Sequence, residues 1–151
     1  MIPFELVFFD AKPPALNQKN SSCYELYASD SITIFPNAYS RVPTGVRLAL
    51  NRMVMERSTP DGTWQPETFA IHHRCGLLLN ADNALRNFGV NVLTQVVAPD
   101  DYSEISVELF NASIYPVAVR RGDPIANLLI IPFMAPGLYH HPQTFRETNN
   151  A

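Results

Sequence analysis

The fold can be worked out from one stretch of the sequence, residues 120–131, which read RRGDPIANLLII. Gly122, Asp123 and Pro124 are residues typical of a turn. The apolar residues after them have the length of one β-strand and end at Pro132, which cannot donate a hydrogen bond to a sheet. The stretch therefore predicts a turn that leads into a buried strand.

Composition limits the class of protein. The chain has 151 residues, of which 46% are hydrophobic, so we expect one domain with a real core. Only 17% are charged and the net charge is -3, which argues against a protein that binds the nucleic-acid backbone. Cys23 and Cys75 have neither metal-site spacing nor a disulfide framework around them. No window could span a membrane and no signal peptide is evident, so we expect an intracellular protein without a metal site.

The pattern along the chain predicts an all-β fold. Thirteen prolines leave few windows for a long helix, and short segments rich in β-branched and aromatic residues lie between them. In Glu104–Asn111 the apolar and polar residues alternate with period 2, as in a strand with one buried face. The expected strands are Phe4–Phe9, Cys23–Ala28, Ser31–Phe35, Arg41–Leu50, Glu67–His73, Val90–Val97, Glu104–Asn111, Tyr115–Val119 and Ile125–Ile131.

The other segments complete the expected organisation. Asn80–Asn87 is the one candidate for a short helix, and Met53–Gln65 is expected to be a strand end followed by a long loop. Residues 1–139 are expected to form one β-barrel domain, and residues 140–151 a polar C-terminal tail.

Several segments, taken in order, match a known set of motifs. They are SCYELYA (22–28), RVPTGV (41–46), RCGL (74–77), QVVAPDDY (95–102) and the stretch at 120–131. In this order they resemble the motifs of the trimeric dUTPase family, whose versions read AGYDLxA, VPTGV, PRSGL, GVIDxDY and GDRIAQ. The resemblance covers roughly residues 20 to 135.

The resemblance implies a distorted jelly-roll or β-barrel of the dUTPase type, with a short helix at most, assembled as a homotrimer. In such enzymes the sites lie between subunits, Mg²⁺ assists, an aspartate of the third motif activates water, and a glycine-rich fifth motif closes over the nucleotide. Carried over to this chain, the positions that hold the nucleotide and its phosphates would be Arg74, Cys75, Gly76, Tyr102 and Asn127.

The third motif departs from the family at the catalytic base. Counting back from Asn111 places the base at Ala98, and aligning Tyr102 instead places it at Pro99; neither side chain can take a proton. Asp100 and Asp101 lie close by and are the catalytic candidates. The alternative is that they belong to a simple hairpin turn.

Further departures affect binding. Gln95 replaces a glycine where the family backbone approaches the ligand, Cys75 replaces a serine hydroxyl, and Asn127 is one methylene shorter than the family glutamine. The glycine-rich fifth motif is absent from the sequence. Together these changes are typical of a scaffold that has lost its catalytic site.

Three hypotheses result. The first is a viral dUTPase-fold protein that has lost dUTP hydrolysis and regulates a host protein partner in the host cytoplasm or nucleus. It would be similar in style to the dUTPase-derived early-region-4 protein of adenoviruses, and would need no cofactor. The second is an active dUTP diphosphatase, with Asp100 or Asp101 as base and Mg²⁺ as cofactor, that converts dUTP to dUMP and pyrophosphate. The third is a sensor that binds dUTP or dUMP without hydrolysis.

Overall fold

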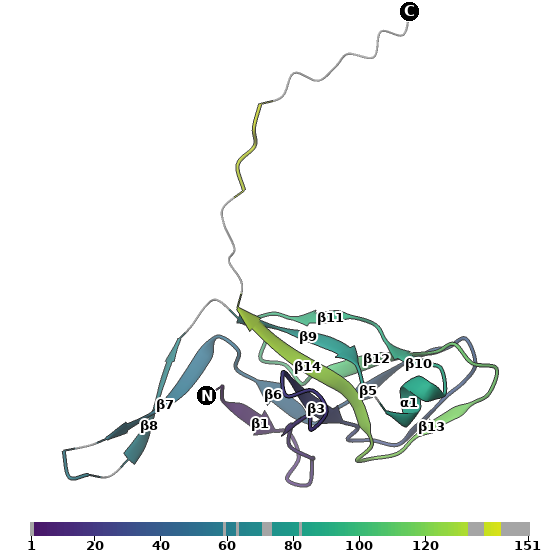
Figure 1. Cartoon of the computed structure of the whole chain (residues 1–151), viewed down its shortest axis with the longest axis horizontal. Coiled ribbons are helices and arrows are strands. Elements are labelled where there is room, and N and C mark those ends of the chain that lie inside the picture. Colours follow the sequence, from purple (N-terminus) through teal and green to yellow (C-terminus); the bar gives the residue numbers. More distant parts are fainter. Residues whose placement is uncertain are drawn as a thin grey trace, which may run out of the picture.

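The computed structural model describes residues 2–58, 60–62, 64–70, 74–81, 83–132 and 138–142, and for 53–58 and 64–70 it describes the backbone alone. The tail from residue 143 onward therefore lies outside the described residues. As the sequence predicts, the described chain is almost entirely short antiparallel strands (Figure 1). The strands are β1 Phe4–Leu6, β2 Ala15–Leu16, β3 Cys23–Tyr27, β4 Ile32–Ile34, β5 Tyr39–Pro43, β6 Val46–Leu48, β7 Arg52–Ser58, β8 Trp64–Ala70, β9 Arg74–Asn80, β10 Val90–Val92, β11 Gln95–Val97, β12 Ser106–Asn111, β13 Val117–Val119 and β14 Pro124–Pro132.

Strand β14, formed by the stretch quoted above, is the central strand of the larger sheet. It pairs with β9 on one side and with β3 on the other, in a five-stranded sheet of order β11-β9-β14-β3-β2. The turn before it is closed by the Asp123 N–H, which donates to the Arg120 carbonyl at 3.0 Å, and the Gly122 N–H joins it to the Ala28 carbonyl at 2.7 Å. The predicted turn and buried strand are confirmed.

A second, three-stranded sheet of order β10-β12-β5 covers the other side of the core. In β12 the inward residues Val107, Leu109 and Asn111 are buried, while the alternate positions are half-buried, which confirms the predicted period of 2. The pairs β1-β6 and β13-β4 complete the body. Among the described residues, no helix is long and apolar enough to cross a membrane.

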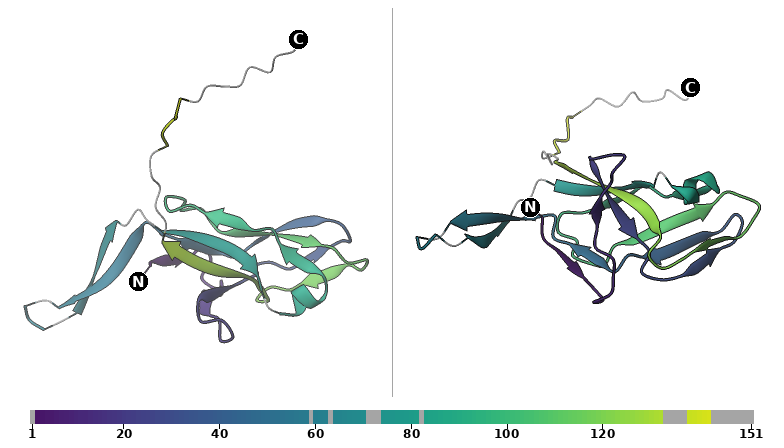
Figure 2. Two further views of the ribbon diagram at one scale, coloured as in Figure 1. Left: turned by 45° about the horizontal axis from the view of Figure 1, so that its top comes forward. Right: turned by 60° about the horizontal axis from the view of Figure 1, so that its bottom comes forward.

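The segment expected to be a loop is instead a β-ribbon. Strands β7 and β8 pair antiparallel from Arg52 opposite Ala70 to Ser58 opposite Trp64, and they form a sheet of their own. Figures 1 and 2 show this ribbon projecting from one end of the body in every view. The prediction of a long loop within Met53–Gln65 was therefore wrong. A hairpin can form although apolar and polar residues alternate little along its strands, because the turn residues Asp61 and Gly62 bring the two strands together.

Other boundaries also differ from the expectation, and Arg41–Leu50 is divided between β5 and β6. Val90–Val97 is two strands, because Val92 pairs with Leu109 in one sheet whereas Gln95 pairs with Leu78 in the other, so the chain crosses between layers at residues 93–94. The helix α1, Ala84–Asn87, begins later than expected, after the cap residue Asn83.

Asn111 ties three segments together at the end of β12. Its side chain is fully buried, and its amide nitrogen donates to the carbonyls of Ile34 at 2.9 Å and Tyr115 at 2.8 Å. Its amide oxygen accepts from the backbone N–H and the hydroxyl of Ser113. Every hydrogen-bonding atom of this buried amide is therefore satisfied, and β4 is linked to the turn after β12.

Gly45 forms the turn between β5 and β6. Its φ is +70°, and a Cβ built there would lie 2.8 Å from the Cβ of Ala11 and 3.3 Å from that of Ser29. Its carbonyl accepts from the Val7 N–H at 2.7 Å, and its N–H donates to the Glu104 carboxylate at 2.9 Å. Only a residue without a side chain fits this conformation and this close approach.

Candidate functional site

The turn between β11 and β12 contains both catalytic candidates. It is closed by the Asp101 N–H, which donates to the Ala98 carbonyl at 3.2 Å. The Asp101 carboxylate accepts from both the backbone N–H and the hydroxyl of Ser103, and these hydrogen bonds lower its pKa. A carboxylate held in its charged form in this way is a poor proton acceptor and a good turn residue.

Asp100 and Tyr102 face a different hollow from Asp101. They line an open cavity of about 640 Å³ together with Glu5, Arg52 and other residues near the base of β7. The pKa of Tyr102 is raised, first by partial desolvation and then by its hydrogen bond to Glu5. Asp100 is exposed and is the candidate whose carboxylate could reach a ligand in this cavity.

Asp101 itself lines a small cleft of about 90 Å³ beside β11 and β12. Arg41, Gln95 and Glu104 border the same cleft. The Gln95 side-chain oxygen accepts from the Glu108 N–H at 3.3 Å, so this side chain bridges from β11 to β12. Arg41 and Glu104 were not singled out as site residues from the sequence. Arg41 only precedes the VPTGV motif, and Glu104 only begins an alternating strand, so their charge was the one signal that could have identified them.

The three candidates on β9 occupy different environments. Arg74 lines a separate, mostly apolar cavity of about 410 Å³, and Cys75, next to it on the strand, is half-buried on the opposite face. At Gly76 a Cβ would lie 2.9 Å from the Leu128 side chain and 3.3 Å from that of Val97. Close packing of three strands is therefore sufficient to explain this glycine.

Asn127 lies on β14 and is 6% exposed. Its side-chain oxygen accepts from the Asn17 amide at 3.0 Å, and its side-chain nitrogen donates to the Asn80 carbonyl at 3.2 Å. Both polar ends of this amide are engaged inside the chain. In the described part of the chain, Asp100 and Tyr102 thus line one cavity, whereas Arg74 and Asp101 each line a different one.

A magnesium ion would need ligands beyond those that the described residues supply. In the part of the chain that the structure describes, no three His, Cys, Asp or Glu side chains gather as a metal site. Mg²⁺ in nucleotide sites is usually held by one or two carboxylates together with substrate phosphates. Asp100, which is exposed and lines the cavity of about 640 Å³, could supply such a carboxylate, so the described residues fit Mg²⁺ that arrives with a nucleotide.

Comparison with known proteins relates the chain to dUTPases. No protein-family model matches the sequence. A deoxyuridine 5'-triphosphate nucleotidohydrolase of Antonospora locustae is 28% identical over 139 residues, which are 92% of this chain and 83% of the relative. The enzyme of the same name from Avian adenovirus 8 is 28% identical over 140 residues, 90% of this chain and 74% of the relative.

Solved structures agree on the fold. The dUTPase of Staphylococcus bacteriophage 80alpha superposes with a TM-score of 0.76 at 13% identity, covering 95% of this chain and 97% of that one. A mutant dUTPase from phage phi11 of S. aureus, described with a structural Mg(II) ion, gives 0.73 at 15% identity and covers 96% and 99%. The molecule is thus a β-rich jelly-roll of the dUTPase type. By sequence it is similar to dUTPases, one of them from an adenovirus.

Proposed function

We propose that this chain is a viral dUTPase-fold protein that no longer hydrolyses dUTP and that regulates a host protein by direct contact. The observation that carries the proposal is the turn between β11 and β12. Ala98 and Pro99 stand where the resemblance places the catalytic base, and the nearby Asp101 carboxylate is occupied by Ser103. Hydrolysis needs a carboxylate free to accept a proton from water.

Three further observations support this proposal. Asn127, at a position expected to bind phosphate, has both polar ends engaged by Asn17 and Asn80. The phage dUTPases that share the fold are described as controlling the transfer of virulence genes, so regulation by a dUTPase fold has a precedent among those proteins. The β7–β8 ribbon projects from the body (Figure 1) and offers a place where contacts to another protein could form.

We further propose that the protein is a homotrimer assembled through the outer face of the five-stranded sheet. Along β9, β11 and the end of β14, the side chains on this face are apolar and partly exposed, and Val96 is 66% exposed. Register places Leu77 between Val96 and Leu129, and Cys75 beside Ile131, so the apolar surface is continuous. A continuous apolar face of this kind usually marks a contact between proteins.

The assembly is tested by light scattering coupled to size exclusion. We expect a mass three times the 16.9 kDa of one chain. Leu77→Glu should release monomers, because a charge in an apolar interface loses its hydration without gaining a partner. Ile114→Glu is the matched control, since Ile114 is 79% exposed on another part of the surface. A monomeric wild-type protein would contradict the proposal.

The alternative function is dUTP diphosphatase activity. It is favoured by one observation, that Asp100 and Tyr102 line the same cavity of about 640 Å³ with Arg52. In that case Asp100 would accept a proton from water as the water attacks phosphorus, and dUTP would yield dUMP and pyrophosphate. Magnesium would contribute charge neutralisation of the phosphates.

An assay of pyrophosphate release separates the two functions. With dUTP and Mg²⁺ we expect no turnover above background, because no free carboxylate occupies the base position. Should the wild-type protein turn over dUTP and Asp100→Asn abolish it, the alternative would be established and the proposal abandoned. Glu108→Gln serves as the control for removal of a nearby carboxylate outside this cavity.

A further inference from the structure

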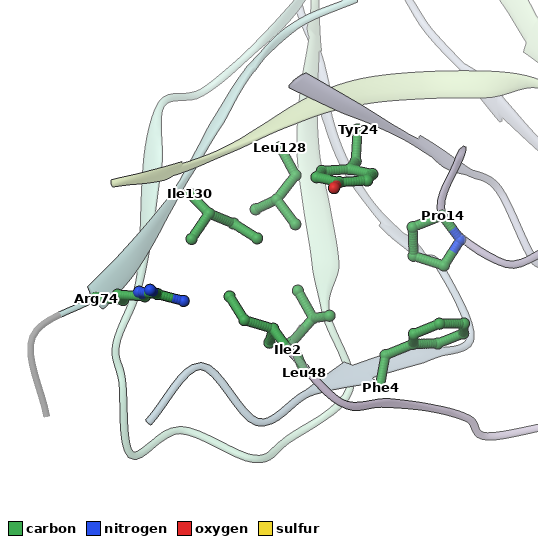
Figure 3. A pocket seen from close by; sticks show the side chains of 8 residues that line it. All are labelled: Ile2, Phe4, Pro14, Tyr24, Leu48, Arg74, Leu128 and Ile130. Atoms are coloured by element: carbon green, nitrogen blue, oxygen red, sulfur yellow. The ribbon is translucent and has the colours of Figure 1, made fainter. Parts of the chain in front are cut away.

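The cavity that contains Arg74 differs in character from the other two. It has a volume of about 410 Å³ and its lining is mostly carbon. Figure 3 shows the Arg74 side chain at one end, and the rings of Phe4, Pro14 and Tyr24 grouped at the other end. A single cation thus faces an aromatic and proline cluster across an apolar groove, which we call the Arg74 groove.

Aliphatic side chains fill the space between the two ends of the groove. Leu128 and Ile130 of β14 lie on one side, and Ile2 and Leu48 lie opposite them (Figure 3). In the ladder, Ile130 and Leu128 alternate with Leu129 and Ile131 of the outer face. Because neighbouring residues of a strand point to opposite faces, the groove and the proposed trimer face do not compete.

The charge of Arg74 has no counterpart within the described part of the chain. Neither a hydrogen bond nor an ion pair joins its guanidinium to any described residue. A guanidinium beside apolar side chains gains most from a carboxylate that enters with its own apolar neighbours. The groove is therefore complementary to an anionic group attached to an apolar body.

The surroundings of the groove favour a peptide over a small amphiphile. Phe4 is 46% exposed and Tyr24 is 41% exposed, so each ring is only partly covered by the groove. Leu16, 52% exposed, is the register partner of Tyr24 and extends the apolar surface beyond the cavity. A ligand small enough for the cavity alone would leave these side chains in water, whereas an extended peptide would cover them.

We propose that the Arg74 groove binds an extended segment of a partner protein that has an acidic residue at one end, aliphatic residues next to it and an aromatic residue at the other end. The acidic group pairs with Arg74, and the aromatic ring packs against Phe4, Pro14 and Tyr24. The Arg74 groove would be the surface that contacts the partner. That the partner is a protein rests on the proposed function.

The test uses the full chain and two acetylated, amidated tetrapeptides, DLLF and NLLF, followed by calorimetry. Wild-type protein should bind DLLF about tenfold more tightly than NLLF, since a charge-assisted hydrogen bond is lost in the second peptide. Arg74→Gln should remove that difference, and Tyr24→Ala should weaken both peptides. Arg120→Gln and Tyr115→Ala are the matched controls, because both side chains are exposed outside the groove.

Several results would overturn the proposal. One is that the wild-type protein does not bind DLLF at millimolar peptide, and another is that it binds DLLF and NLLF equally. A third is that it binds decanoate and neither peptide, which would indicate a site for small amphiphiles. The wild-type comparison of two peptides stands even if a variant fails to fold. Turnover of dUTP would contradict the proposed function but not peptide binding by the groove. Absence of both turnover and peptide binding would contradict only the proposal about the groove.

Discussion

Replacement of Asn111 by alanine is expected to lower the free energy of unfolding by about 3 to 5 kcal/mol, because it breaks a buried hydrogen-bond network rather than one bond. The amide is fully buried and bonds to the carbonyls of Ile34 and Tyr115 and to the N–H and hydroxyl of Ser113. Alanine would remove the amide donor to the Ile34 carbonyl, in a buried site, and the acceptor of the Ser113 N–H. The measurement is urea unfolding at one fixed protein concentration.

Two further variants serve as controls for this prediction. Asn87→Ala removes an exposed asparagine side chain at the end of α1 and should change stability by less than about 0.5 kcal/mol. Asn111→Asp keeps the shape but points carboxylate oxygen at the carbonyls of Ile34 and Tyr115, so it should be at least as destabilising as alanine. A loss below about 1 kcal/mol for Asn111→Ala would show that the network contributes no more than a single average hydrogen bond.

Gly45→Ala is expected to lower the free energy of unfolding by about 2 to 4 kcal/mol, through backbone strain and overpacking together. The φ of +70° disfavours any side chain, and the new Cβ would lie 2.8 Å from the Cβ of Ala11. Relief of the contact would require movement of the chain on one side of the turn. The hydrogen bonds of Gly45 to Val7 and Glu104 would be disturbed by that movement.

The chain contains a matched control that separates the two causes. Gly122 has φ +88°, but a Cβ added there would meet nothing within 4 Å, so Gly122→Ala should show the strain alone, about 1 kcal/mol. Ala11→Gly combined with Gly45→Ala should recover part of the loss, because it removes the contacting atom. Equal losses for Gly45→Ala and Gly122→Ala, with no recovery in the double variant, would show that the close contact contributes nothing.

The parts of the fold that the sequence predicts well are those in which local pattern and tertiary position agree. In Ser106–Asn111 the alternation of residue types matches alternation of burial, and the turn at 122–124 leads into the central strand. The β7–β8 ribbon was missed because its strands pair only with each other. They do not belong to a sheet with one buried face, and it is such a face that requires apolar and polar residues to alternate. The break at residues 93–94 was missed because both halves are equally suited to a strand and only the change of sheet divides them.

The candidate site is harder to predict for a physical reason. Sequence motifs mark positions, but contacts decide what each position does. Asn127 and Gly76 both match motif positions, yet in the chain one is engaged by Asn17 and Asn80 and the other is packed against Leu128. No single motif marks the groove around Arg74, since its lining comes from β1, β3, β6, β9 and β14 and from Ile2 and Pro14.

The self-contained pairing of β7 with β8 has an evolutionary consequence. The hairpin begins and ends at Arg52 and Ala70, which lie opposite one another, so the two points where it joins the body are close together. Lengthening, shortening or exchange of the hairpin would leave the ladders of β9, β12 and β14 unchanged. Selection can therefore vary this appendage from one lineage to the next without putting the domain that supports it at risk.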